Sequence, residues 1–170
     1  MSEMFPAVMK HLVQFEVKAK ARYDKGQYWW ELRACDYYNE FEKLKIIFPD
    51  IATRAECMLD YTQSYCVNTA YIIPVEDYYL LGILNSNVVH FFYSSLTTSI
   101  RGGYLRFIRQ FVEQIPIPLG EPQKEISTLV NSRIKSEDDH KSYEIESQIN
   151  QLVYQLYGLT EEEIGIVEGR

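Results

Sequence analysis

The pattern of apolar and polar residues divides the chain into an opening helix, a middle part with short strands and a helical end. In the opening part, apolar residues recur at intervals of three and four, as on one face of a helix. This stripe consists of Phe5, Val8, Leu12, Phe15 and Ala19. We therefore expect a helix over about residues 5–23, with Pro6 in its first turn and Gly26 just beyond its end.

Short apolar runs in the middle of the chain predict a small sheet. Residues 45–49 form an apolar run closed by proline, which is typical of a buried strand. Residues 57–59 and 65–67 are separated by a polar stretch and are predicted to form a hairpin. Residues 71–74 predict a further strand. A helix over about residues 77–95 should then follow, with Asp77 as its N-cap.

The last fifty residues carry two apolar stripes at helical spacing, and one of them predicts a helix near residues 140–157. Gly158 stands where a helix C-terminus favours glycine, and residues 160–163 match a capping box at the start of another helix. Residues 115–118, Ile-Pro-Ile-Pro, cannot form a regular helix and are interpreted as a connector. The fold class is therefore α+β: a mixed small sheet with packed helices over residues 1–118, and a helical C-terminal appendage over residues 119–170.

Composition changes this interpretation little, whereas the distribution of charge adds to it. The net charge of −7 looks unfavourable for binding nucleic acid, but residues 121–170 contribute −6 of it and residues 1–120 only −1. The three cysteines show no CxxC spacing, which favours neither a disulfide framework nor a zinc site. No apolar run is long enough to span a membrane and no signal peptide is visible, so we expect a soluble, cytoplasmic protein.

Motifs of catalysis are missing from the sequence. It contains no GxGxxG, Walker A, GxSxG or HExxH pattern, and no Asn-Pro-Pro-aromatic loop of the kind that holds an amine for methyl transfer. Pro49 and Asp50 could begin a nuclease motif, but no Glu-x-Lys follows at a suitable distance. The acidic residues 161–163 are explained by a helix start. We therefore expect no catalytic centre, metal site or cofactor in this chain.

Several stretches, in this order and at these distances, resemble one family. They are KGQYWWELR at 25–33, KIIFPDI at 45–51, YLLGILNS at 79–86, SIRGGYLRF at 99–107, QIPIP at 114–118 and INQLVYQLYGLTEEEI at 149–164. Together they resemble the TaqI-like C-terminal specificity domain, which is found in adenine-specific DNA methyltransferases and in fused restriction–methylation enzymes of type IIG. The resemblance covers roughly residues 5–168.

The resemblance implies a division of labour in a bacterial restriction–modification enzyme. A separate N-terminal catalytic domain of the same polypeptide binds S-adenosylmethionine and methylates adenine, and some relatives add an endonuclease domain. The C-terminal domain recognises the target sequence in double-stranded DNA. This chain lacks every motif of the catalytic domain, as expected for the target-recognition part alone, with DNA and the catalytic methyltransferase domain as its partners and no membrane.

The candidate DNA-binding residues fall into two groups. In the first, Trp29 and Trp30 are expected to point to opposite faces of an extended segment, one into the core and one toward DNA, or else both are structural. Arg33 and Lys45 stand near predicted strand ends and are further candidates.

The second group surrounds a glycine pair: Arg101, Gly102, Gly103, Arg106 and Arg109. Glycine lets the backbone approach a phosphate closely, and arginine can bind phosphate or guanine. The alternative is a solvated loop with surface ion pairs. The sequence thus predicts sequence-specific DNA recognition; the alternative function is a protein-interaction module that docks its amphipathic tail onto the catalytic domain.

Overall fold

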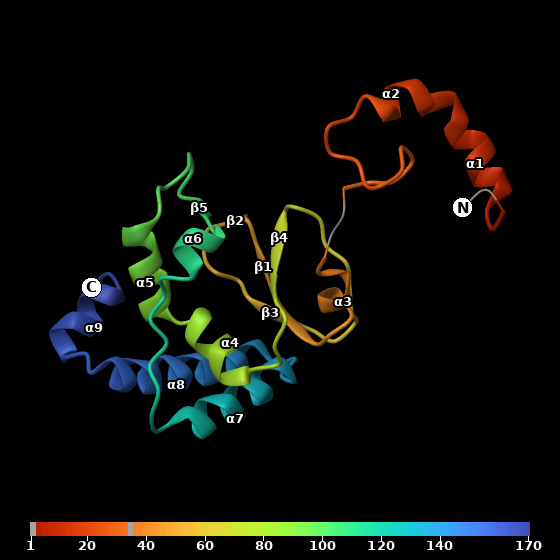
Figure 1. The fold of residues 1–170 in the computed structure, drawn as a ribbon. Coiled ribbons are helices and arrows are strands. Elements are labelled where there is room, and N and C mark those ends of the chain that lie inside the picture. The colour runs from red at the N-terminus through yellow and green to blue at the C-terminus, as the bar shows by residue number, and fades with distance from the viewer. Residues whose placement is uncertain (1–2, 34–35) are drawn as a thin grey trace. The chain divides into compact units, whose positions relative to one another are not determined.

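A computed structural model describes residues 3–33 and 36–170 of the chain (Figure 1). The chain divides into two compact units, Met1–Asn39 and Glu40–Arg170, and each is described by itself. The short helix α3 (Tyr38–Phe41) crosses this boundary. In the described part of the chain, no helix combines the length and the apolar character that a membrane crossing requires.

The first unit begins with the expected helix, which is interrupted by one tighter turn. Its parts are α1 (Pro6–Leu12), the 3-10 turn η1 (Val13–Phe15) and α2 (Glu16–Lys20). Pro6 occupies the first turn, as predicted. None of these three elements contains a buried residue. The apolar stripe that predicted the helix therefore remains largely exposed within the unit.

The second unit is built on a three-stranded antiparallel sheet. The central strand β1 (Lys45–Pro49) has the bounds that the apolar run predicts, and it pairs with β3 (Met58–Asp60) and β4 (Ala70–Ile73). In this register Ile46 lies opposite both Leu59 and Ile73. A second, two-stranded sheet joins β2 (Ile51–Ala52) to β5 (Leu105–Arg106), which α6 (Arg109–Val112) follows.

The predicted hairpin between residues 57–59 and 65–67 is wrong. Residues 65–67 are not a strand, and β3 pairs with β1 instead. The cause is Asp60, because its carboxylate accepts hydrogen bonds from the backbone N–H groups of Thr62 and Ser64, both at 2.8 Å. A side chain that captures the backbone in this way favours a turn over a ladder.

The predicted helix over residues 77–95 is two helices, α4 (Tyr78–Leu84) and α5 (Asn87–Leu96). Asp77 caps α4, as expected, by accepting a hydrogen bond from the N–H of Leu80. Ser86 then acts as a second N-cap and accepts one from the N–H of Val89. Because an N-cap residue has an extended backbone, the chain bends there and α5 runs in a new direction.

The C-terminal part is helical as predicted: α7 (Gln123–Ile134), α8 (Asp139–Tyr157) and α9 (Glu161–Val167). Gly158 ends α8 in the left-handed conformation, with φ of 66°, and Thr160 and Glu163 form the expected capping box. The α+β class with a helical C-terminal part is therefore confirmed.

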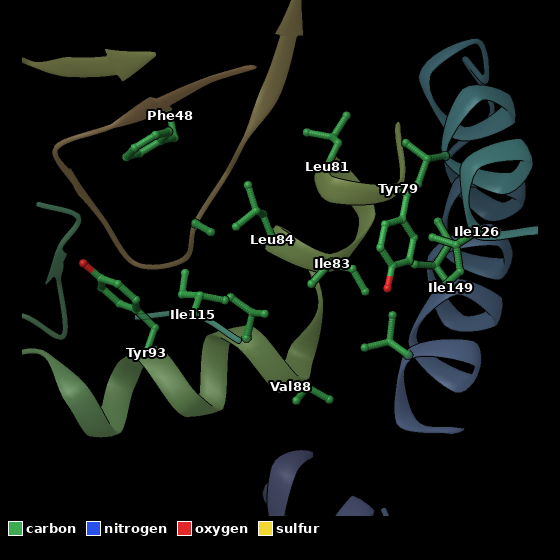
Figure 2. Close-up of a cluster of buried hydrophobic side chains, with 14 of the residues drawn as sticks. Phe48, Tyr79, Leu81, Ile83, Leu84, Val88, Tyr93, Ile115, Ile126 and Ile149 are labelled. Carbon is green, nitrogen blue, oxygen red and sulfur yellow. The ribbon is translucent and has the colours of Figure 1, made fainter. Parts of the chain in front are cut away.

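The core of the second unit is continuous from the sheet to the C-terminal helices. Side chains of α4 lie between Phe48 of β1 and the residues Ile126 and Ile149 of α7 and α8 (Figure 2). Gly82 of α4 packs tightly against α7, since a Cβ atom there would lie 2.9 Å from the side chains of Ile126 and Val130. The division into a recognition domain up to residue 118 and a helical appendage after it stays a prediction. Residues from both sides of this boundary contribute to the same core.

Candidate nucleic-acid interface

The glycine pair forms the tip of a short hairpin, residues 100–106, which we call the arginine hairpin. The N–H of Ile100 donates to the carbonyl of Tyr104 at 2.7 Å, and the N–H of Gly103 donates back to the carbonyl of Ile100 at 3.2 Å. Gly102 and Gly103 have φ of 89° and 81°, in the left-handed region that favours glycine. The sequence therefore needs both glycines to close this tip.

The base of the arginine hairpin is fixed to α5. The hydroxyl of Tyr93 donates to the carbonyl of Arg106 at 2.8 Å, and the hydroxyl of Thr97 donates to the same oxygen at 3.3 Å. The ring of Tyr93 also stacks on Phe107, with centroids 4.6 Å apart. Burial raises the pKa of Tyr93 to about 12, so this phenol keeps its proton and remains a donor at neutral pH.

The three arginines of this region are exposed and only weakly held. Arg101 lies at the tip and has no ion-pair partner among the described residues. Arg106 is 3.4 Å from Asp50, and Arg109 is 2.6 Å from Glu113, the C-cap residue of α6. Ion pairs at exposed sites contribute about 0–1 kcal/mol, so a phosphate could readily replace these carboxylates.

Asp50 joins the arginine hairpin to the main sheet. Its N–H donates to the carbonyl of Thr69 at 2.9 Å, and its own carbonyl accepts from the N–H of Phe107 at 2.7 Å. Its carboxylate faces Arg106. Sequence reasoning considered Asp50 only as a start of a nuclease motif; the structure gives it a structural role between two distant segments.

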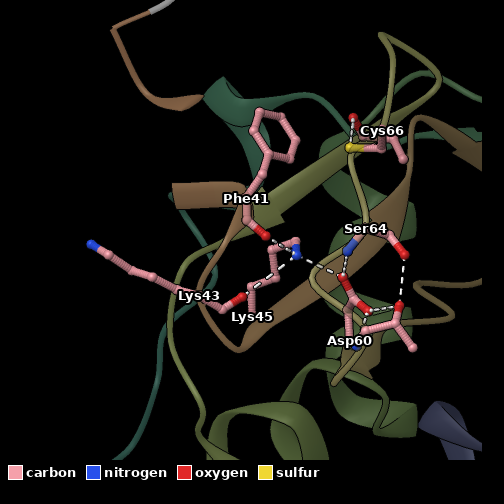
Figure 3. A network of polar contacts seen from close by, with 8 residues as sticks. Phe41, Lys43, Lys45, Asp60, Ser64 and Cys66 are labelled. Atoms are coloured by element: carbon pink, nitrogen blue, oxygen red, sulfur yellow. Dashed lines mark hydrogen bonds and ion pairs between the residues drawn. The ribbon is translucent and has the colours of Figure 1, made fainter. Parts of the chain in front are cut away.

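Lys45 occupies a different environment from the one expected for a DNA contact. Its side chain is 0% exposed, and its amine donates to the carboxylate of Asp60 and to the carbonyl of Phe41, both at 2.6 Å (Figure 3). Burial opposes ionisation of Asp60, but hydrogen bonds from Lys45, Thr62 and Ser64 outweigh it and hold the pKa of this carboxyl well below its usual range. Lys45 thus has no free surface for a phosphate and stabilises the turn after β3.

The tryptophan pair lies in a closed loop of the first unit. Trp29 and Trp30 stand in a turn, so the expectation of opposite faces on an extended segment is wrong: their rings meet edge to face, with centroids 5.5 Å apart. Trp30 also stacks on Tyr28 at 4.8 Å. Arg22 holds the loop by donating to the carbonyls of Trp29 and Glu31, at 3.1 and 2.6 Å.

The predicted site residues therefore have three different settings. The structure brings Arg101, Gly102, Gly103 and Arg106 together in one hairpin, and Arg109 follows it at the start of α6. It buries Lys45 away from that hairpin's surface. Trp29, Trp30 and the exposed Arg33 belong to the separate first unit.

A cleft that sequence reasoning missed lies beside the N-terminus of α5. It has a volume of about 810 Å³, and its wall includes Arg54, Asn87, His90 and Asn150. The guanidinium of Arg54 donates to the side-chain oxygen of Asn87 at 2.7 Å, and burial, together with Arg54, lowers the pKa of His90. Both effects favour the neutral form of the His90 imidazole. Nothing in the sequence pattern joins these residues, because they come from segments far apart.

The described cysteines, Cys57 and Cys66, are free thiols, and Cys57 is a poor nucleophile. Cys57 and Cys66 are half-buried and form no disulfide, and burial raises the pKa of the Cys57 thiol to about 12. A thiol with so high a pKa stays protonated at neutral pH and is unreactive. Cys35 lies outside the described residues.

A comparison with known families decides the classification. The sequence profile described as the TaqI-like C-terminal specificity domain matches residues 8–117, which is well over half of the chain. The chain belongs to this family. The match to the TaqI-like domain includes the tryptophan loop and the whole arginine hairpin, and it ends within the Ile-Pro-Ile-Pro connector.

Two curated relatives of this TaqI-like domain are similar over much of its length. A type II methyltransferase, M.XhoI, of Xanthomonas vasicola is 26% identical over 171 residues, which cover 96% of this chain and 30% of the relative. A second, M.PaeR7I of Pseudomonas aeruginosa, is 28% identical over 130 residues, which cover 74% of this chain and 21% of the relative. The chain spans less than a third of the length of these relatives.

Proposed function

We propose that this chain is the DNA target-recognition module of a type II restriction–modification methyltransferase. The observation that carries the proposal is the arginine hairpin, inside a domain whose family is named for specificity. Its tip presents Arg101 beside two glycines that leave the backbone uncovered, and Arg106 and Arg109 flank it. The two curated relatives are type II methyltransferases, which supports the enzyme class.

The chemistry of this hairpin suits both parts of DNA recognition. Exposed guanidinium groups can neutralise phosphates, which gives affinity without sequence preference and releases counterions. The same group can donate two hydrogen bonds to the O6 and N7 atoms of guanine in the major groove, which gives sequence preference. A backbone without side chains at the tip allows close approach to either target.

The charge of the second unit supports an orientation for this contact. Residues 121–170 carry a net charge of −6, whereas residues 40–120 of the same unit carry only −2 and segment 101–109 contains no acid. DNA would be repelled by the acidic helices and attracted by the arginine hairpin. We therefore place the DNA on the hairpin side of the second unit and the acidic helices away from it.

Methyl transfer belongs, in this proposal, to a separate domain of the same polypeptide. That domain would bind S-adenosylmethionine and act on adenine, with or without a fused endonuclease. This chain has no cofactor loop or methyl-transfer loop in its sequence. Titration calorimetry with S-adenosylmethionine should therefore detect no binding to this chain alone, and micromolar affinity would contradict the assignment of the cofactor to another domain.

The test of DNA recognition uses arginine variants of the protein that carries this chain. DNA affinity of Arg101→Ala, Arg106→Ala and Arg109→Ala should be measured at two salt concentrations. Loss of an arginine that binds phosphate should weaken binding about equally for all sequences and reduce the salt slope by about 1. Loss of an arginine that reads a base should instead weaken cognate binding by roughly 1–3 kcal/mol and leave other sequences little changed.

The control for these variants is Arg133→Ala on α7, because Arg133 pairs with Glu146 across the acidic helices. It should leave both affinity and salt slope unchanged. If all three hairpin variants keep the affinity, the salt slope and the melting temperature of the wild type, the proposal that DNA binds this face of the domain is wrong.

One observation favours docking onto the catalytic domain as a second function. An apolar groove of about 430 Å³ lies between α5 and α9, where Phe91 is 43% and Ile166 is 55% exposed. Exposed apolar surface of this kind often marks a protein interface. If docking is its function, Ile166→Asp should weaken salt-independent binding to the catalytic domain, measured by co-purification, and leave the DNA salt slope unchanged.

A further inference from the structure

A tight turn at residues 67–70 lies next to the arginine hairpin. The N–H of Ala70 donates to the carbonyl of Val67 at 3.1 Å, which closes the turn around Asn68 and Thr69. The carbonyl of Thr69 accepts from the N–H of Asp50 at 2.9 Å, and Asp50 in turn bonds to Phe107 and faces Arg106. One residue thus fixes the turn and the hairpin to each other.

The side chains of this turn are exposed and uncommitted. Val67 is 71% exposed, and Asn68 and Thr69 are exposed as well. Within the described part of the chain, no hydrogen bond engages the amide of Asn68 or the hydroxyl of Thr69. The turn therefore presents a free donor–acceptor pair beside an apolar side chain, on a backbone that is held from both ends.

The far end of the same loop is anchored by the buried pair described above. Asp60 accepts from Lys45 at 2.6 Å and from the N–H groups of Thr62 and Ser64 at 2.8 Å each. The loop between β3 and β4 is thus fixed at Asp60 on one side and at Asp50 on the other. A reading element needs this kind of support, because a small displacement of a contact group loses its hydrogen bonds.

We propose that the turn at residues 67–70 is a second reading element, in which Asn68 recognises an adenine in the major groove. The proposal rests on the DNA-recognition function proposed above and adds a residue and a base to it. An asparagine amide can accept from N6 and donate to N7 of adenine, and this pair of hydrogen bonds fits no other base. Val67 lies at the next position and can contact the methyl group of the paired thymine.

The division of labour between the two elements follows from their charge. Residues 61–70 contain no lysine or arginine, so the turn cannot contribute to phosphate binding as the arginine hairpin can. It contributes discrimination and little salt dependence. Asp50 couples the two elements, so that phosphate contacts by Arg106 set the register in which Asn68 meets its base pair.

The experiment uses the protein that carries this chain and a target sequence found by sequencing the DNA that it methylates. Affinity is measured for the cognate duplex and for duplexes in which each A·T pair in turn becomes G·C. Asn68→Ala should weaken cognate binding by roughly 5- to 150-fold. For the duplex in which the A·T pair read by Asn68 has become G·C, wild type and variant should bind equally. The salt slope of the variant should equal that of the wild type. Asn68→Asp keeps the shape of the side chain but loses the N–H donor, so it should show the same loss of cognate binding as Asn68→Ala.

The matched control is Gln148→Ala, which removes an exposed amide from α8 and should change neither affinity nor discrimination. An equal loss on every duplex, or no loss on any, would overturn the role of Asn68. The arginine variants separate the two proposals. If they lower the salt slope while Asn68→Ala has no effect, only the second reading element fails; if they too have no effect, DNA recognition by this face fails.

Discussion

The arginine hairpin and the interior of the second unit contain the same kinds of residue, a cation and a glycine, in opposite environments. Arg101 is exposed, and a Cβ atom added at Gly103 would meet nothing within 4 Å, whereas Lys45 is 0% exposed and Gly82 lies tight against α7. The cation in the interior is bound by Asp60, and the cation at the tip is available to a ligand. Residue type alone therefore does not indicate function here; the environment decides between support and recognition.

The largest effect is expected for Lys45→Ala. Removal of the amine leaves Asp60 buried and without its cation, and breaking a buried pair in this way costs about 3–5 kcal/mol of the free energy of unfolding. Urea denaturation followed by circular dichroism measures this loss. A variant that loses DNA affinity while its stability is unchanged would give Lys45 the contact role that its burial argues against.

Acid denaturation examines the same pair independently. Because the pKa of Asp60 is lowered in the fold, its contribution to stability is complete above its unfolded pKa of about 4 and is lost as the pH falls through the folded value. Asp60→Asn should therefore remove part of the stability loss below about pH 4. Equal acid sensitivity of variant and wild type would contradict the lowered pKa.

A smaller effect is expected for the interior glycine. In Gly82→Ala the new Cβ would lie 2.9 Å from Ile126 and Val130, and overpacking of this kind costs about 1–3 kcal/mol. Gly165→Ala on α9 is the matched control, because nothing lies within 4 Å of its Cβ position. Since alanine favours a helix over glycine, the control should be neutral or gain up to about 1 kcal/mol. A melting curve distinguishes the two outcomes.

The hairpin glycine offers a test in which strain is matched. Gly103 and Gly158 both have left-handed φ, at 81° and 66°, and neither position has a neighbour within 4 Å. Alanine at either should cost about 1 kcal/mol of stability. DNA affinity should fall for Gly103→Ala alone, in a binding titration at fixed salt; an equal fall in both would mean that the effect reports stability and not contact. Gly26 is less suitable as a control, because a Cβ there would meet Glu31 at 2.6 Å.

The smallest effect on stability is expected for Arg109→Ala. Its partner Glu113 lies one helical turn away, and both side chains are exposed. The free energy of unfolding should therefore change by no more than about 0.5 kcal/mol. Thermal denaturation at low salt is the appropriate measurement. A loss above about 1 kcal/mol would show that Arg109 also stabilises the fold.

The elements that the sequence predicts well are those with local causes. The strand at residues 45–49 is marked by its apolar run and its proline, and the capping box at Thr160 is complete within four residues. The predictions of a hairpin at residues 57–67 and of a single helix at residues 77–95 are wrong for one shared reason. In both, a polar side chain, Asp60 or Ser86, binds the backbone and redirects the chain.

The candidate site divides in the same way. The arginine hairpin is visible in sequence because its arginines and glycines lie within nine residues. The burial of Lys45 is not, because it depends on an aspartate fifteen residues away. Nor is the position of the turn that carries Asn68, because Asp50 binds it at Thr69 and is itself bonded to the distant Phe107. Contacts between distant segments decide which polar residues remain free.

The continuous core around Gly82 has a consequence for how target specificity could be exchanged between enzymes. A recombination point in the proline-rich connector would separate α4 from the helices that cover it, and would leave Ile126, Val130 and Ile149 against foreign side chains. A grafted reading surface should therefore be transplanted together with all three C-terminal helices. Chimaeras joined near residue 40 keep this interior intact, and under the proposed function they are the natural starting point for changing the DNA target.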